Sequence, residues 1–144
     1  NEAAPLEILQ ILQSSGADMD RVIMGHLDRT VASLDMLREI ASTQCVLEWD
    51  LFGNEVSYYQ PSDFDMPSDA QRMDFIKAMI DDGIGDRIVI AHDICTKHRL
   101  VRYGGHGYGY ILEHIVPRMR TRNFSESEIH SLVQGNPGRL LTIT

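Results

Sequence analysis

Three short apolar runs, separated by segments with helical spacing, constrain the fold more than any other feature of this 144-residue sequence. Each run ends in a polar residue, and the runs are 21–26 ending at His26, 45–50 ending at Asp50, and 87–93 ending at Asp93. Nearly continuous apolar strands that alternate with helices are typical of a parallel sheet covered on both faces. The pattern therefore predicts an α/β fold built from βα units.

Capping residues and helical spacing predict the segments between these strands. Apolar residues at helical spacing across residues 5–15 predict a first helix, and Gly16 follows where a helix would stop. Ser33 is the predicted N-cap of a second helix. Capping boxes begin at Ser68 and Ser125, and each predicts a further helix.

Two stretches rich in loop-forming residues remain. Residues 51–67 contain Asn, Asp, Ser and Pro together with Phe52, Tyr58, Tyr59 and Phe64, which indicates a functional loop. A glycine-rich stretch at 104–109 leads into a predicted helix that contains Pro117.

Three parallel strands cannot close a sheet on themselves, and apolar strands need partners at both edges. A (β/α)8 TIM barrel needs about 250 residues. We therefore expect residues 1–144 to be the C-terminal portion of one barrel domain, its last three βα units, with further strands upstream. The absence of an initiator methionine agrees with this expectation. The alternative is a small three-stranded α/β domain.

Composition excludes several classes of protein. The formal net charge of −8 argues against nucleic-acid binding, which needs clustered Lys and Arg. Cys45 and Cys95 give neither a disulfide framework nor a Cys-x-x-Cys zinc motif, so a reducing compartment, the cytoplasm, is expected. No apolar run approaches the roughly 20 residues that span a bilayer, so we expect no membrane partner.

The strand ends are the predicted location of the chemistry, because catalytic side chains of βα barrels project from the C-terminal ends of the strands. His26 and Asp93 are residue types that bind Zn²⁺ or a similar ion. A lone histidine is more often a packed, hydrogen-bonded core residue. Polar residues at three successive strand ends favour the functional interpretation for both.

Four motifs carry a resemblance to a known family. They are MGHLDRT at 24–30, LEWDLFG at 47–53, AHDICTK at 91–97 and YGGHGY at 103–108. In combination they resemble the phosphotriesterase family of the amidohydrolase superfamily, over the chain from about Pro5 to its end. The resemblance implies a metal-dependent hydrolase.

The implied active site holds two divalent cations, with Zn²⁺ the first choice. His26, at the end of the sixth barrel strand, would bind one ion, and Asp93, at the end of the eighth, would bind the other. Asp93 would also take a proton from the water that the two ions activate. The family's other ligands are a His-x-His on the first strand, a carboxylate or carboxylated lysine on the fourth and a histidine on the fifth. None is present here, so we expect the isolated chain to be inactive.

The remaining histidines receive no ligand role. Neighbouring strand side chains point to opposite faces, so if Asp93 faces the metals, His92 faces the helix layer as a packed, hydrogen-bonded residue. The others are His98, His106, His114 and His130, which lie in predicted loops or helices.

The motifs depart from organophosphate-hydrolysing members of the family at two positions. Arg29 and Leu51 stand where those enzymes have an acid and a histidine of a proton relay. Because arginine binds carboxylate, phosphate and sulfonate well, Arg29 suggests a small anionic substrate. Lys97, Arg99 and Arg102 could add to the positive field, or they could belong to a solvated loop. The resemblance implies amides of the N-acetyltaurine or N-acetyl amino acid type.

Other functions stay open. One is a lactonase or phosphotriesterase-type ester hydrolase, and another is a non-catalytic barrel protein, because a barrel does not itself imply activity. Nucleotide binding by the glycine-rich stretch 104–109 is disfavoured, since it does not directly follow a strand. A homodimer of the full-length protein also stays open.

Overall fold

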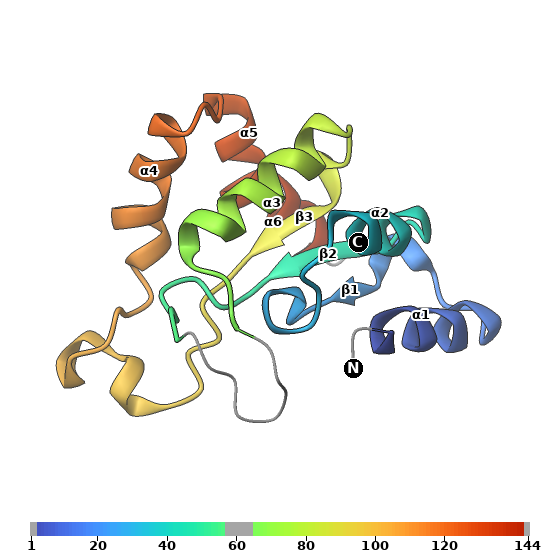
Figure 1. Ribbon diagram of the computed structural model, residues 1–144, viewed down its shortest axis with the longest axis horizontal. Coiled ribbons are helices and arrows are strands. Elements are labelled where there is room, and N and C mark those ends of the chain that lie inside the picture. The colour runs from blue at the N-terminus through green and yellow to red at the C-terminus, as the bar shows by residue number, and fades with distance from the viewer. Residues whose placement is uncertain (1–2, 57–64, 143–144) are drawn as a thin grey trace.

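A computed structural model, described here for residues 3–56 and 65–142, contains one sheet of three parallel strands in the order β1-β2-β3 (Figure 1). The strands are β1 (Ile23–Met24), β2 (Val46–Trp49) and β3 (Ile88–Ile90). The predicted α/β class and its three parallel strands are confirmed. Each strand is shorter than predicted, because 3-10 turns at Met19–Arg21 and Gly85–Arg87 precede β1 and β3, and the polar ends leave the sheet.

Six α-helices surround the sheet in the described residues. They are α1 (Ala4–Ser14), α2 (Leu34–Ser42), α3 (Asp69–Asp81), α4 (Val116–Thr121), α5 (Glu126–His130) and α6 (Asn136–Leu141). Ser33 caps α2, and both predicted capping boxes are present, at Ser68 for α3 and Ser125 for α5.

π-Helical turns extend two of these helices. One, Ile111–Ile115, leads directly into α4, and the other, Ser131–Gly135, joins α5 to α6. Pro117 is the second residue of α4 and directly follows the π-helical turn, and a proline inside a helical segment removes one backbone hydrogen bond. The helix predicted around Pro117 is therefore one continuous helical segment that changes its winding just before the proline.

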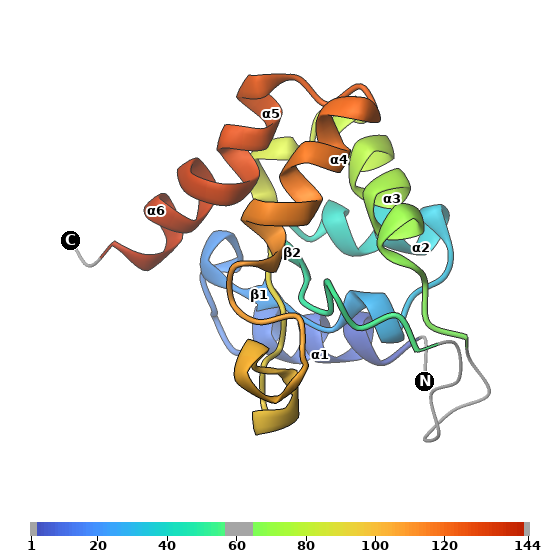
Figure 2. The same cartoon turned by 90° about the vertical axis from the view of Figure 1, so that its left-hand side faces the viewer.

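The two faces of the sheet have different cover. In Figure 2, α2 and α3 lie on one side of the strands and α6 on the other. Leu47 and Trp49 point into the main hydrophobic core, where Met73 and Ile76 of α3 pack. Because strand side chains alternate, Glu48 and Asp50 point to the opposite face. That alternation gives the sheet one apolar face and one face that carries acids.

The long segment after β2 is only partly a loop of the predicted kind. Phe52 is fully buried in the core, with the Arg72 guanidinium 5.9 Å from its ring centroid. Tyr58, Tyr59 and Phe64 lie outside the described residues. Within the described ranges, no helix has the length and apolar character needed to cross a membrane.

Candidate functional site

His26 and Asp93 follow β1 and β3, two and three residues after the last strand residue, in an unusual backbone conformation. Both residues are left-handed, with φ of 58° at His26 and 45° at Asp93. Non-glycine residues adopt this region at some cost, and such residues cluster at functional sites. Both residues therefore lie outside the regular backbone of the sheet.

Asp50 holds the His26 ring in place. The Oδ1 atom of Asp50 lies 2.9 Å from Nδ1 of His26, and its Oδ2 accepts the His26 backbone N–H at 3.0 Å. A carboxylate at Nδ1 favours a proton on that nitrogen, and in a neutral imidazole this leaves the lone pair on Nε2. An imidazole oriented by a carboxylate is the usual arrangement of a histidine that binds a metal.

Gly25 makes room for the acids of β2. A Cβ atom at Gly25 would lie 2.8 Å from Oε2 of Glu48 and 3.1 Å from Oδ2 of Asp50. Burial raises the pKa of the half-buried Glu48, and the nearby negative charge of Asp50 raises it further. The glycine of the Gly-His motif therefore admits two carboxylates beside the histidine.

Buried charged side chains adjoin the His26–Asp50 pair. Asp28 accepts the backbone N–H of Asp50 at 2.8 Å and the Arg72 Nε–H at 2.6 Å. Burial raises the pKa of Asp28 to about 6, while the positive charge of Arg72 opposes that rise. The other arm of Arg72 bonds Asp69 at 2.6 Å, and Asp69 also accepts the Tyr110 hydroxyl at 2.8 Å.

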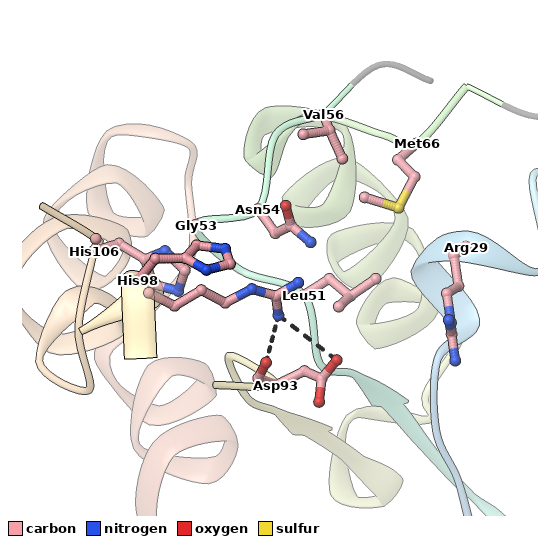
Figure 3. Close-up of a pocket in the computed structure, with 11 residues that line it drawn as sticks. Arg29, Leu51, Gly53, Asn54, Val56, Met66, Asp93, His98 and His106 are labelled. Atoms are coloured by element: carbon pink, nitrogen blue, oxygen red, sulfur yellow. Dashed lines mark hydrogen bonds and ion pairs between the residues drawn. The ribbon is translucent and has the colours of Figure 1, made fainter. Parts of the chain in front are cut away.

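A cavity of about 510 Å³ opens above Asp93. Its lining comes from the loops after all three strands and from the segment before the helix at 111: Arg29, Leu51, Gly53, Asn54, Val56, Met66, Asp93, His98, Arg99, Gly105 and His106. Figure 3 shows Asp93 at the floor, with His106 and Arg29 on opposite sides. Polar residues from separate loops that converge on one cavity mark a candidate binding site.

The four basic residues predicted to bind substrate fall into two groups. Arg29 and Arg99 line the cavity, and Arg99 donates to the Asp93 carbonyl and lies 3.7 Å from its carboxylate. Lys97 and Arg102 are exposed and lie over the Tyr103 ring, at 5.7 and 5.9 Å from its centroid. The structure thus brings two of the four to the cavity.

His92 lies where strand alternation places it. Its Nε2 accepts the Ile111 backbone N–H at 3.1 Å, and its ring stacks on His106 at 6.1 Å between centroids. Burial lowers the pKa of both rings, so both are neutral near pH 7. The prediction of a packed, hydrogen-bonded His92 is confirmed.

His106 forms a cavity wall that the sequence did not indicate. A Cβ at Gly53, which has φ of 85°, would lie 2.7 Å from the His106 ring, so only glycine permits this contact. Asp50 was predicted as a polar strand end, but its contact with His26 was not, and Asp28 and Arg72 were missed as partners of the site. These residues form hydrogen bonds with partners that are distant in the sequence. Asp28 and Asp50 are 22 residues apart, and Asp28 and Arg72 are 44 residues apart.

The donors fit a divalent cation in kind. His26 offers an oriented imidazole and Asp93 a carboxylate, which are the usual ligands of zinc. Across the described part of the chain, no group of three or more His, Cys, Asp or Glu side chains is arranged to hold a metal ion. His26 and Asp93 are therefore two donors of the right chemical kind, and whether they bind a metal stays a prediction.

Comparison with known proteins decides the family. The family model described as "Phosphotriesterase family" matches residues 1–141. The chain belongs to the phosphotriesterase family. It is 54% identical over 144 residues to N-acetyltaurine hydrolase of Dictyostelium discoideum and 49% identical over 143 residues to phosphotriesterase-related protein of Nematostella vectensis. Each match covers 99% of this chain but only 39% and 41% of the relative, so the chain spans about two fifths of their length.

Solved structures agree with the family assignment. A resiniferatoxin-binding protein from Rhodobacter sphaeroides superposes with a TM-score of 0.88 at 28% identity, over 94% of this chain and 38% of that one. The phosphotriesterase homology protein from Escherichia coli, complexed with phosphate in its active site, gives 0.85 at 28% identity, over 98% and 45%. The three-stranded parallel sheet therefore has the arrangement found in family structures.

Proposed function

We propose that the protein containing this chain is a metal-dependent hydrolase that acts on amides of small anionic acids. One observation carries the proposal: Asp93 lines the same cavity as Arg29 and Arg99, so a carboxylate and two guanidinium groups share one pocket. The relatives named N-acetyltaurine hydrolase support an acyl-amide substrate with a negatively charged end. In this proposal the cavity binds that end and presents the amide to Asp93.

The proposed fold is the C-terminal three βα units of a (β/α)8 barrel. β1 and β3 each pair on one side only within the described residues, and the chain matches about two fifths of longer relatives. A barrel would give both strands a second neighbour and would bring ligands from other strands toward His26 and Asp93. The first-strand His-x-His would be one such contribution.

In the proposed mechanism, His26 would hold one divalent cation and Asp93 another, with zinc the first choice. When bound, the ions would lower the pKa of a water and polarise the scissile carbonyl. Asp50 keeps Nδ1 of His26 protonated and its Nε2 available. Asp93 accepts the proton of the attacking water and passes it to the leaving amine. Arg29 and Arg99 orient the substrate by its anionic end.

A second candidate is the hydrolysis of a lactone or phosphoester. The Escherichia coli relative with phosphate in its active site favours it, because the same arginine pair could bind a phosphoryl group. An assay of the purified full-length protein on N-acetyltaurine, a lactone and a phosphoester distinguishes the candidates. The proposal requires the highest kcat/KM on the amide.

Asp93→Asn in the full-length protein tests the mechanism. The amide cannot accept the proton and is a weaker metal ligand, so we expect kcat to fall at least 10³-fold with an unchanged circular dichroism spectrum. Asp86→Asn is the matched control, because Asp86 is exposed in the turn before β3. Near wild-type turnover by Asp93→Asn would remove Asp93 from the mechanism.

Arg29→Ala tests the anionic substrate. Loss of a charge-assisted contact to the substrate costs about 1.5–3 kcal/mol, so we expect KM for N-acetyltaurine to rise roughly 10-fold or more. Arg102→Ala is the control, because Arg102 lies over Tyr103 outside the cavity lining. An unchanged KM in Arg29→Ala would rule out Arg29 as the anchor.

A further inference from the structure

We propose that Arg72 is a positioning residue: its buried guanidinium aligns the His26–Asp50 pair with the walls of the cavity. Arg72 lies on α3, with its side chain fully buried, and touches neither the cavity nor His26 directly. Its contacts instead reach the segments that form the site. That this alignment matters for catalysis rests on the proposed function.

The guanidinium has a different partner on each nitrogen. Nε donates to Asp28 at 2.6 Å, Nη1 to Asp69 at 2.6 Å and Nη2 to the carbonyl of Asn54 at 3.0 Å. Both carboxylates are fully buried, like the arginine. Buried charges of this kind are costly unless every group is paired, and ion pairs add little to stability compared with apolar packing. Their geometry therefore suggests a role in alignment.

One arm of the network leads to His26. Asp28 uses Oδ1 for Arg72 and Oδ2 for the Asp50 backbone N–H at 2.8 Å. Asp50 in turn binds the His26 ring and its backbone N–H. Arg72 thus fixes Asp28, Asp28 fixes the main chain of Asp50, and that main chain sets where the Asp50 carboxylate meets the imidazole.

The other arm leads to the cavity walls. Asp69 accepts the Gly53 backbone N–H at 3.2 Å and the Tyr110 hydroxyl at 2.8 Å. Tyr110 packs edge-on against His106, and the His106 ring lies against Gly53. Gly53, Asn54 and His106 all line the cavity. Both arms therefore meet at one guanidinium.

Lysine could not replace this arginine. The partners lie in three directions from a planar group, and an ammonium presents its donors from a single point. Arg72→Lys keeps the charge and much of the length but loses the fork. If alignment is the role of Arg72, a charge-conserving change should disturb the site.

Arg87, in the 3-10 turn before β3, offers a matched control. Its guanidinium also donates to the main chain of another segment, at the Ala41 carbonyl 2.9 Å away, but it lies at the opposite ends of the strands. Arg87→Lys should therefore lower stability without moving the site. A comparison of Arg72→Lys with Arg87→Lys therefore distinguishes loss of alignment at the site from a general loss of stability.

The experiment uses the full-length protein with zinc and N-acetyltaurine. We expect Arg72→Lys to remain folded by circular dichroism, to lose 10- to 100-fold in zinc affinity and at least 10-fold in kcat, and to exchange the His26 Nδ1 proton faster by NMR. Arg87→Lys should keep zinc affinity, kcat and that exchange rate within twofold of wild type.

The two hypotheses fail in different ways. If wild type hydrolyses none of the tested substrates, the proposed function fails. The exchange rate of the His26 Nδ1 proton still tests the positioning role of Arg72, because that measurement does not depend on activity. Wild-type zinc affinity and proton exchange in Arg72→Lys would overturn that role. So would an equal loss in Arg87→Lys, because activity would then follow stability alone. Should Arg72→Lys not fold, Asp28→Asn provides the same readouts.

Discussion

At the scale of single residues, backbone conformation determines where the candidate ligands point. His26 and Asp93 both have positive φ, and the backbone N–H of His26 bonds the same carboxylate that holds its ring. The cost of a left-handed residue is of the order of 1–3 kcal/mol where the surroundings must impose it. Asp50 therefore both stabilises the left-handed conformation of His26 and orients its imidazole ring.

Gly25→Ala tests how closely these groups fit. A methyl group would lie 2.8 Å from Glu48 Oε2, a flexible side-chain end, and 3.1 Å from Asp50 Oδ2, which is held by His26. We expect a stability loss of about 1 kcal/mol or less by urea unfolding, because the carboxylates can shift. Zinc affinity of the full-length protein should nevertheless fall about 10-fold, because the His26–Asp50 contact shifts with them.

Gly138→Ala is the control for that substitution. Among the described residues outside its own helix backbone and chain neighbours, no atom lies within 4 Å of a Cβ built at Gly138, which is in α6. Alanine there should stabilise the protein by about 0.4–1 kcal/mol and leave zinc affinity unchanged. Equal zinc affinity in Gly25→Ala and wild type would contradict the proposed fit.

The sequence predicts His26 and Asp93 as candidate ligands, but it could not indicate the residues that contact them. A polar residue at the end of an apolar strand is visible as a local pattern, and strand alternation is enough to assign His92 to the helix side. Arg72 and Asp28 lie 44 residues apart, and their pairing exists only after α3 packs beside the first strand loop. The same holds for His106 against Gly53.

At the scale of elements, capping residues predicted where helices start more accurately than apolar patterns predicted where strands end. Ser68 and Ser125 each accept the predicted N3 backbone N–H and receive the reciprocal bond. A cap is a local interaction, so four residues of sequence are enough to predict it. Strand length depends on pairing with a distant segment, which explains why the predicted strands were too long.

Glu128→Gln tests the electrostatic part of the α5 cap. Glu128 pairs with Lys77 of α3 at 2.8 Å and with the Ser125 N–H, and these contacts lower its pKa below the usual 4.5. Glutamine retains the capping hydrogen bond, so the change isolates the charge. We expect a loss of about 0.5 kcal/mol at pH 7.

The pH dependence of that loss follows from the direction of the shift. A lowered folded-state pKa stabilises the protein above pH 4.5, and the contribution disappears as the pH falls through the folded value. Urea unfolding at pH 7 and pH 3 should therefore show a larger difference between wild type and Glu128→Gln at pH 7 than at pH 3. Glu39→Gln, at an exposed position, should show none at either pH.

At the scale of the whole molecule, a column of rings connects β3 to the helical segment that starts at Ile111. His92 stacks on His106, His106 meets the edge of Tyr110, and Tyr110 lies 5.1 Å from His114 between centroids. Tyr110 also bonds Asp69, at the start of α3. The sheet, α3 and the C-terminal helices therefore share one partly buried set of titratable groups.

His92, the member of this column next to β3, should make the stability of the protein fall in mild acid. Burial and the neighbouring His106 lower the pKa of His92 below its usual 6.5, against a smaller opposing effect of Asp69. The unfolded chain then binds more protons than the folded one below pH 6.5, so stability falls as the pH drops from 6.5 through the folded pKa. Above that window His92 contributes no pH dependence.

Replacing His92 with glutamine should remove part of that dependence. The glutamine carbonyl can accept the Ile111 N–H in place of Nε2, so we expect a loss of about 1 kcal/mol at pH 7.5 but a shallower decline between pH 6.5 and 5. Urea unfolding across this range measures both. His130→Gln is the control, because His130 is exposed on α5. A decline in His92→Gln as steep as in wild type would show that protonation of His92 is not what couples acid to unfolding, and would shift that role to His106.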